Sequence, residues 1–434
     1  MQKIRINKLL TALCMITVMI LVSGCTALPE ADVGIVMADD RELRVVALSE
    51  ADVLEDVVGA TRIVGMTMLS QGDSDANMVV SPSSVVVALS MLSEGAHGDT
   101  LAELESVIGA TGESRRDVLA ALRSALREFE GDPSVVQDRN LPEKPLLHLA
   151  AQVVVDDELI VEDAYLEALA DVYAAGVQFA DLGSGDAKKV LDAWVRYHSG
   201  GLIQESAINP DDMLRLVIQD AVVLAARWQS PFSAEATRDR AFFLSDGAEI
   251  NVPTMMQDGY FTYVEIEGWQ ALRLFYVGQS LHADFILPPK GIDPATARAD
   301  LLAELSAALD EAVAGDIEVY MPALDVQNEE PADLVQALRA LGLERVFDEY
   351  LAELSGIGID VNGDNLFLNQ AVQQAVLQVD EEGTRAAAVT ELGLAGSMLP
   401  EMPQEIRFDR PYLIQIAHTE SSWPLFLAAI RDPR

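Results

Sequence analysis

Apolar positions recur at helical spacing along several stretches of the chain. Residues 50–70 and 99–130 carry them with acidic first turns, which predicts helices in both stretches. The same spacing predicts helices at residues 163–173, 186–200 and 332–343. Helices therefore dominate the first half of the chain and return once towards its end.

Apolar runs of strand length make up much of the remainder. They are bounded by Gly, Pro and Asp, as is typical of strands joined by turns. The predicted strands cover residues 148–157, 216–228, 271–277, 280–288, 316–326, 411–419 and 424–430. No break in composition divides the chain, so the mixed pattern predicts a single large α+β domain.

Residues 381–397, EEGTRAAAVTELGLAGS, fit neither a core helix nor an ordinary solvated loop. As a strand, they would carry small and aliphatic side chains on one face and both charges on the other. The first face is Thr384, Ala386, Ala388, Thr390, Leu392 and Leu394, and the second is Arg385, Ala387, Val389, Glu391, Gly393 and Ala395. An Ala-rich helix is the alternative, and Gly383, Gly393 and Gly396 argue against it. From these residues alone, both conformations remain open.

The charge of the chain limits the classes of partner that it can bind. The chain has 70 acidic and 29 basic residues, and its formal net charge is −41. Such a surface repels phosphate backbones, so we expect no nucleic-acid partner. The acidic residues are spread along the chain rather than gathered in a tail, which favours a charged, solvated surface.

The N-terminal segment predicts export. A basic start, MQKIRINK, precedes the apolar run LLTALCMITVMILVS, which together indicate a signal peptide over residues 1–24. LVSGC, ending at Cys25, resembles the bacterial lipobox, and this implies an acylated Cys25 that contacts a lipid membrane. An ordinary cleaved signal and an uncleaved anchor are the alternatives. We expect a lipidated tether over residues 25–47 and a cell-envelope location on the extracellular or periplasmic side.

No catalytic motif stands out in the sequence. The histidines lack metal-ligand spacing, and HExxH, CxxC, GxSxG and phosphate-loop patterns do not occur. His198 stands beside Ser199 at the end of a predicted helix, where a surface histidine is the ordinary explanation. We therefore expect no enzyme, no metal site and no cofactor. An envelope hydrolase with a carboxylate pair is an alternative that no motif supports.

Several segments resemble one family, the serpins. NMVVSPSSVVVALSMLSEGAHGDTLAEL (77–104) is similar to the family's strand, Ser-Pro-x-Ser and buried helix. AARWQSPFSAEAT (225–237) is similar to the strand that ends in Gly-x-Trp and to the Phe and Thr after it. VPTMMQDGYFTY, FILP, MPALDV, ALGLERVF and RFDRPYLIQIAHTESSWPLFLAAIRDP follow in the family's order. The resemblance covers residues 48–434, and VDEEGTRAAAVT (379–390) resembles the hinge of the reactive-centre loop.

The resemblance implies the fold and the mechanism. The fold is a single α+β domain over residues 48–434, with a central, mostly antiparallel five-stranded sheet, two smaller sheets and about eight or nine helices. An exposed reactive-centre loop is expected at about residues 381–403. A serpin offers this loop as substrate to a serine protease and traps the acyl-enzyme when the cleaved loop inserts into the central sheet.

The resemblance also implies roles for single residues. The loop hinge comprises Glu381, Glu382, Gly383, Thr384, Ala386, Ala387, Ala388 and Thr390. Ser81, Ser84, Asp220, Gln373 and Trp228 match the positions called the shutter and the breach, where the sheet opens. Gln373 and Asp220 depart from the family's His and Asn. Ala323 stands where the family has a Lys partner for Glu381, so we expect that salt bridge to be missing.

Two adjacent bonds compete as the scissile bond. Counting forward from Glu381 at the family's spacing gives Ser397–Met398, which we favour, and Met398–Leu399 is the alternative. No Arg or Lys occurs between Arg385 and Arg407, so we expect a target with small or apolar specificity.

The expected function is therefore that of an irreversible suicide-substrate inhibitor of extracellular serine proteases, acting as a monomer through a covalent complex. A non-inhibitory serpin-fold binding or structural protein of the cell envelope is the alternative.

Overall fold

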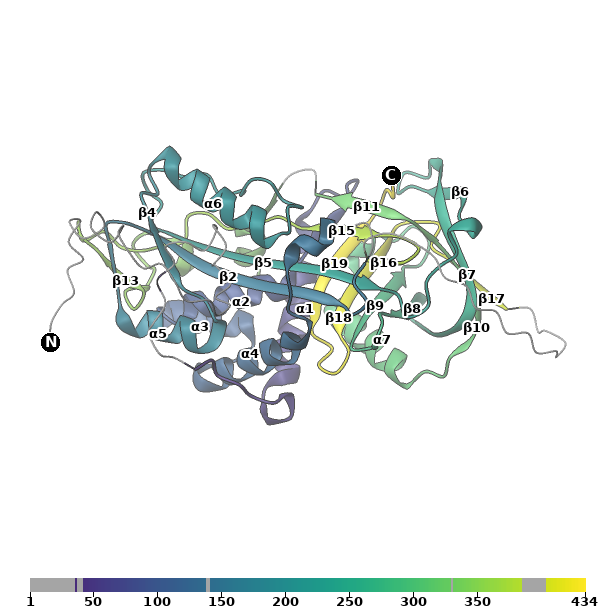
Figure 1. The fold of residues 1–434 in the computed structure, drawn as a ribbon, viewed down its shortest axis with the longest axis horizontal. Coiled ribbons are helices and arrows are strands. Elements are labelled where there is room, and N and C mark those ends of the chain that lie inside the picture. The colour runs from purple at the N-terminus through teal and green to yellow at the C-terminus, as the bar shows by residue number, and fades with distance from the viewer. Residues whose placement is uncertain (1–35, 37–41, 138–140, 329–330, 385–402) are drawn as a thin grey trace, which may run out of the picture.

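The computed structural model describes residue 36 and residues 42–137, 141–328, 331–384 and 403–434. Two sheets and the helices around them form one body (Figure 1). The strands of the central sheet run along the length of the molecule. A larger sheet extends from β18 and β19, near the middle of the view, to β6, β7, β10 and β17 on the right (Figure 1).

Helices form in each stretch where the apolar spacing predicts them, and a further helix at Ala299–Glu311 was not predicted. In the described residues they are α1 (Leu54–Gln71), α2 (Pro82–Ser93), α3 (Gly98–Ile108), α4 (Gly112–Leu126), α5 (Asp163–Tyr173), α6 (Gly185–His198), α7 (Ala299–Glu311) and α8 (Val335–Ala340). The predicted helical stretch 99–130 is divided because Gly109 takes a left-handed conformation, with φ +82°, and ends α3.

The central sheet has the strand order β11-β15-β16-β5-β2-β4. Its strands are β11 (Leu324–Gln327), β15 (Val376–Val379), β16 (Gly383–Thr384), β5 (Leu216–Arg227), β2 (Leu146–Asp156) and β4 (Val177–Ala180). All pairings are antiparallel except β2 with β4. Five of these strands are the expected central sheet, and the two residues of β16 add a short sixth strand between β15 and β5.

The second sheet joins the two further sheets that the resemblance implies. Its strands are β1 (Met78–Val80), β19 (Pro424–Ile430), β18 (Tyr412–His418), β9 (Leu281–Leu287), β8 (Trp269–Phe275), β7 (Glu249–Ile266), β10 (Gly315–Pro322), β17 (Gln404–Arg407) and β6 (Arg238–Phe243). The long strand β7 pairs with β8 through its C-terminal part and with β10 and β6 through the rest. One continuous strand therefore connects both parts.

Two short strand pairs complete the described structure. They are β3 (Leu159–Val161) with β13 (Gly358–Asp360), and β12 (Ala332–Asp333) with β14 (Val372–Gln373). The predicted helix at 332–343 thus begins with a strand, because Ala332 and Asp333 pair with β14 before α8 starts.

Helices cover both faces of the central sheet. In Figure 1, α6 lies on one side of β5 and β2, and α2 to α5 lie on the other. The helix α2 packs against both β5 and β19, so it fills the space between the two sheets. Trp194, Trp228 and Trp423 are among the largest fully buried side chains, and they anchor α6, the end of β5 and the start of β19 in the core.

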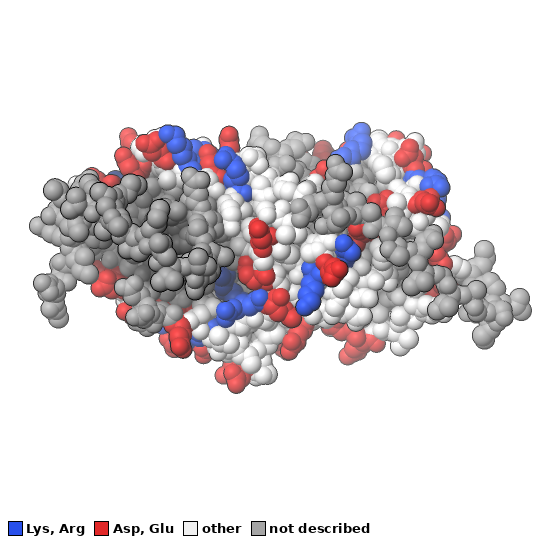
Figure 2. Space-filling view, in the orientation of Figure 1, with Lys and Arg blue, Asp and Glu red and all other residues white. Residues whose placement is uncertain are grey.

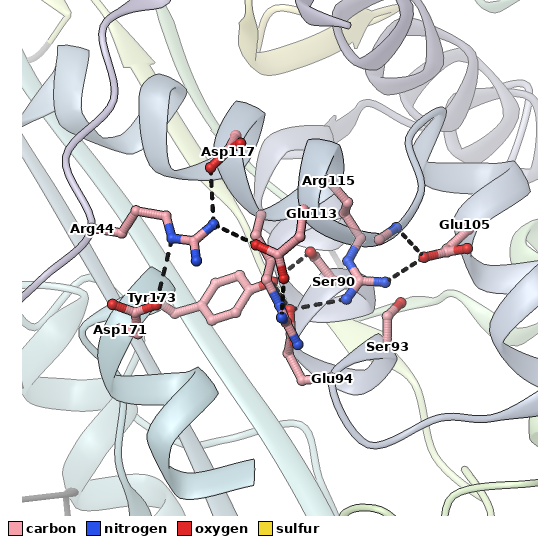
Figure 3. Close-up of polar contacts among 12 residues, drawn as sticks. Arg44, Ser90, Ser93, Glu94, Glu105, Glu113, Arg115, Asp117, Asp171 and Tyr173 are labelled. Carbon is pink, nitrogen blue, oxygen red and sulfur yellow. Dashed lines mark hydrogen bonds and ion pairs between the residues drawn. The ribbon is translucent and has the colours of Figure 1, made fainter. Parts of the chain in front are cut away.

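A buried carboxylate holds α2, α4 and α5 together (Figure 3). The Glu94 side chain is fully buried, and its oxygens lie 3.0 Å from Nη2 of Arg115 and 2.6 Å from Nη2 of Arg116. The hydroxyl of Tyr173 also donates to Glu94, at 3.1 Å. Two guanidinium groups and a phenol thus compensate for the loss of water around one carboxylate.

The segment before the first helices is tied down by one arginine (Figure 3). The Nη1 atom of Arg44 lies 3.0 Å from Glu113 and 2.9 Å from Asp117 of α4, and its Nε atom lies 3.5 Å from Asp171 of α5.

Asp and Glu side chains elsewhere are distributed over the visible face, with basic side chains among them (Figure 2). The described helices include none with the length and apolar character of a membrane span.

Candidate functional site

The hinge of the predicted loop lies inside the central sheet. Gly383 pairs with Arg227 of β5, and Thr384 pairs with Ala226 of β5 on one side and with Val379 of β15 on the other. These two residues form β16, so the chain enters the space between β5 and β15 before it leaves the described residues.

The backbone of β5 lies so close to residue 383 that only glycine fits there. A Cβ atom at this position would lie 2.1 Å from the carbonyl oxygen of Ala226 and 2.8 Å from the Cα atom of Arg227. Both contacts are with backbone, which cannot rotate away. Only glycine therefore lets the hinge approach β5 closely enough to pair with it.

Thr384 points into the core beneath the sheet. Its side chain is 4% exposed, and its hydroxyl shares a hydrogen bond with the phenol of Tyr276. The Tyr276 ring stacks on Trp228, with a centroid separation of 4.6 Å and an interplanar angle of 12°. Burial raises the pKa of Tyr276, an effect that the Thr384 hydroxyl partly opposes. The first inserted side chain thus has a polar partner in an otherwise apolar setting.

A tight turn connects β15 to β16. The Oδ1 atom of Asp380 accepts hydrogen bonds from the amides of Glu382, at 2.9 Å, and Gly383, at 3.3 Å. Trp228 holds the same turn from outside: its amide donates to the Glu382 carbonyl at 2.7 Å, and its Nε1 donates to the Asp380 carbonyl at 3.0 Å. The breach tryptophan therefore fixes the point at which the hinge reverses direction.

Glu381 has a partner other than lysine. The hydroxyl of Thr237 donates to Oε1 of Glu381 at 2.6 Å, and the amide of Phe232 donates to the Glu381 carbonyl at 2.7 Å. Ala323 contributes its amide to the carbonyl of Pro253 instead. Thr237 and Phe232, in the segment after β5, therefore bind Glu381 in this chain, which has Ala323 at the position of the family's lysine.

Beyond Thr384, a cavity of about 180 Å³ continues between the strands. Residues of β5 between Leu216 and Leu224 line one wall, and residues 370–378, which include β14 and part of β15, line the other. Within the described residues, no backbone pairing joins β5 directly to β15, since each of them pairs with β16. The central sheet therefore contains a gap that starts at the hinge.

Comparison with known proteins agrees with this geometry. Residues 63–433 match the family model described as "Serpin (serine protease inhibitor)". The chain belongs to the serpin family. It is 30% identical to alpha-1-antiproteinase of Rattus norvegicus over 373 residues, covering 82% of this chain and 84% of the relative. It is 28% identical to the leukocyte elastase inhibitor of Equus caballus over 380 residues, covering 84% and 95%.

The thermophilic serpin tengpin in its native state shares the fold. The two structures have a TM-score of 0.76 at 20% sequence identity, over 92% of this chain and 97% of tengpin. The serpin fold expected from the sequence is confirmed.

Gln373, at the predicted shutter, contacts the backbone of Ser81. Gln373 accepts a hydrogen bond from the amide of Ser81 at 2.8 Å and donates one to the Ser81 carbonyl at 2.9 Å. Ser81 and Ser84 are buried and line the gap. The backbone of Asp220 pairs with Ala151 in β2, and its side chain lies outside the described part. Gln373 therefore contacts the start of α2 through backbone groups.

Replacing Gln373 by Leu should weaken this contact. The amide of Ser81 would be left without its partner, while the Ser81 carbonyl keeps the amide of Val85 at 3.4 Å. One unpaired buried polar group costs about 1–3 kcal/mol. We expect the free energy of unfolding, measured in urea, to fall by that amount. Gln378→Leu is the matched control: it removes a hydrogen bond to the exposed Asp325 and should change stability by less than about 0.5 kcal/mol. Equal effects of both substitutions would contradict this role of Gln373.

Asp380 should make the hinge turn sensitive to pH. Burial raises the pKa of Asp380 from 3.8 to about 6, and the charges of Glu381 and Glu382 add to the rise, while the amides of Glu382 and Gly383 oppose it. Because the folded-state pKa lies above the ordinary value, the folded protein holds this proton more tightly than the unfolded chain. The stability that Asp380 contributes is therefore present below about pH 4 and is lost as the pH rises through about 6.

Asp380→Asn tests this dependence, because it keeps the acceptor oxygen and removes the titration. Relative to wild type, the variant should gain stability as the pH rises from about 4 to 7, in urea unfolding series at each pH. A constant difference between variant and wild type across this range would show that Asp380 does not titrate in the turn.

The remaining predicted site residues lie outside the described residues. They are Ala386, Ala387, Ala388, Thr390, Ser397, Met398, Leu399 and Cys25. Sequence reasoning missed Tyr276, which lies outside the quoted motifs, and Asp380, which lies in the quoted stretch 379–390 but was given no role there. Across the described ranges, no group of His, Cys, Asp or Glu side chains is arranged to hold a metal ion.

Proposed function

We propose that this serpin is an irreversible suicide-substrate inhibitor of extracellular serine proteases. The protease serine attacks the scissile carbonyl of the loop, which forms an ester bond to the loop residue before the cut and releases the segment after it. Insertion of the freed loop into the central sheet then carries the attached protease away before water hydrolyses the ester. The catalytic groups all belong to the protease.

The position of β16 at the head of the gap is the observation that carries this proposal. Gly383 and Thr384 already pair with both neighbours of the missing strand, so insertion would extend an existing strand. Extending it would pair the backbone groups of β5 and β15 that face the gap, and this pairing favours the inserted state.

The register of β16 indicates how far insertion would extend. Thr384 pairs with Ala226 in antiparallel orientation, so continuation in register would place Thr390 opposite Asp220 and Leu394 opposite Leu216, the first residue of β5. The alternation of the two faces described in the sequence ends at Leu394 and Ala395, close to the residue that would lie opposite the start of β5. Side chains on the Thr384 face, which are small up to Thr390, would then enter the core.

We further propose small or apolar target specificity, with cleavage at Ser397–Met398 or, as the alternative, at Met398–Leu399. The absence of Arg and Lys between Arg385 and Arg407 in the sequence disfavours a trypsin-like protease. The similarity to an equine protein named leukocyte elastase inhibitor supports this direction.

For its location, we propose a lipid anchor at Cys25 and a tether that reaches the serpin domain. Val36 pairs with Val177 at the edge of β4, so the tether would join the central sheet near this strand. Cys25 and Val36 are eleven positions apart in sequence, and a segment of this length spans at most about 35–40 Å when extended. The domain would therefore stay close to the membrane surface, as a monomer.

Incubation with a panel of serine proteases tests the proposed function. A covalent complex that survives SDS, formed with an elastase-, subtilisin- or chymotrypsin-like protease, is the expected result. The cleaved serpin should also unfold at a higher temperature than the intact one, because the inserted strand adds to the sheet. Cleavage without a complex and without this thermal gain would instead support a non-inhibitory binding or structural role.

A further inference from the structure

A second cavity lies among strands of the nine-stranded sheet and shares no lining residue with the gap. It has a volume of about 310 Å³ and is bounded by residues of β6, β7, β10 and β17. Phe242, Pro322 and Phe408 provide apolar walls, and Arg240 and Arg407 line it together with Tyr320. The cavity thus combines an apolar interior with two cationic side chains.

Tyr320 holds both guanidinium groups in place. The Cζ atom of Arg407 lies 4.0 Å from the centroid of the Tyr320 ring, and that of Arg240 lies 4.4 Å away. Arg407 comes from β17, which pairs with β10 in register at Tyr320, whereas Arg240 comes from β6 on the β7 side of β10. Stacking on an aromatic ring restricts both side chains before any ligand arrives.

Arg240 lacks an anionic partner. In the described part of the chain its guanidinium makes no ion pair or hydrogen bond, and its buried Nε is left unpaired. Arg407 is paired with Glu405, at 2.7 Å and 3.0 Å, and the cavity-lining Asp409 lies 3.3 Å from Arg410. The carboxylate in the cavity lining, that of Asp409, is thus engaged by Arg410, and the Arg240 guanidinium remains available to an anionic ligand.

We propose that this cavity is a binding site for a small carboxylate with an apolar body. The Arg240 guanidinium would donate to the carboxylate oxygens, and Arg407 would add positive charge from the other side of Tyr320. Phe242, Phe408 and Pro322 would contact the apolar part. Pockets for small molecules combine mostly apolar walls with a few orienting polar groups, at volumes of about 300–1,000 Å³.

Isothermal titration of the serpin with benzoate tests the proposal. Benzoate has the carboxylate and the apolar ring, and benzamide is a neutral control of nearly the same shape. We expect benzoate to bind and benzamide to bind at least about tenfold more weakly, because a hydrogen bond to a charged group is lost. Equal binding of the two, or no binding of benzoate at about 10 mM, would overturn the proposal.

Two variants locate the site. Arg240→Gln should weaken benzoate binding at least about tenfold. Arg238→Gln, which removes the same charge from an exposed position on the same strand, should leave the affinity unchanged. Arg407→Gln provides a second removal of charge from the cavity if Arg240→Gln does not fold, as judged by circular dichroism. If the cavity variant that folds binds benzoate as wild type does, benzoate binds elsewhere and the assignment is wrong.

Discussion

We expect Thr384→Arg to abolish covalent trapping of the target protease, while the loop is still cleaved. Thr384 is the first inserted side chain on the buried face, and its hydroxyl meets Tyr276 beside the Trp228 ring. A guanidinium at this position would lose its water without an anionic partner, at a cost of several kcal/mol. The arginine would therefore displace the hinge from between β5 and β15, and insertion of the cleaved loop would have to bury it again. Each 1.36 kcal/mol slows that step tenfold, so insertion should become slower than hydrolysis of the acyl-enzyme by water.

The measurement is the yield of SDS-stable complex with a protease that wild type traps, beside the yield of cleaved serpin. Thr384→Ser is the control, because it keeps a hydroxyl for Tyr276 and a small volume, and it should form the complex as wild type does. An undiminished complex with Thr384→Arg would refute the inhibitory interpretation of the hinge.

Gly383→Ala slows insertion even though it adds one methyl group. The added Cβ would meet the carbonyl oxygen of Ala226 at 2.1 Å, and relief of that contact requires β5 and the hinge to separate. Overpacking of this kind costs about 1–3 kcal/mol, which corresponds to a decrease in insertion rate of about fivefold to 150-fold. More serpin molecules should therefore be cleaved for each protease molecule that is trapped.

The stoichiometry of inhibition measures this effect directly. Gly59→Ala is the matched control, since a Cβ at Gly59 in α1 meets nothing within 4 Å. That substitution should leave the stoichiometry unchanged and stabilise α1 by up to about 1 kcal/mol. A stoichiometry for Gly383→Ala equal to that of Gly59→Ala would show that the hinge does not need to approach β5 closely.

The spacing of apolar residues predicted helices and strands best where the whole element packs against a single neighbouring surface. The helix predicted at 163–173 is α5, and the predicted strands 411–419 and 424–430 contain β18 and β19. Their apolar periodicity reflects a single environment along the whole element. Prediction was poorer where an apolar run crosses between sheets: the run 316–326 divides at Pro322 into β10 and β11, which belong to different sheets.

The hinge shows the same division between local and distant information. The small side chains around Thr384 and the two-residue alternation are local features, so the sequence predicted both the segment and its buried face. The partners of the hinge are remote in sequence: Tyr276 lies 108 positions from Thr384, and Thr237 lies 144 from Glu381. No periodicity within a segment can specify such contacts.

By itself, the sequence indicated the family and most of the helices and strands, but not α7, β6 or the long strand β7. The family follows from the resemblance of several motifs, and the elements follow from the short-range spacing of apolar and turn-forming residues. Only the tertiary structure decided that Gly383 and Thr384 already occupy the sheet, that Gln373 binds the backbone of Ser81, and that burial raises the pKa of Asp380. Each of these features depends on contacts between residues that are far apart in the sequence and on the exclusion of water where they meet. Such contacts form only when the chain folds.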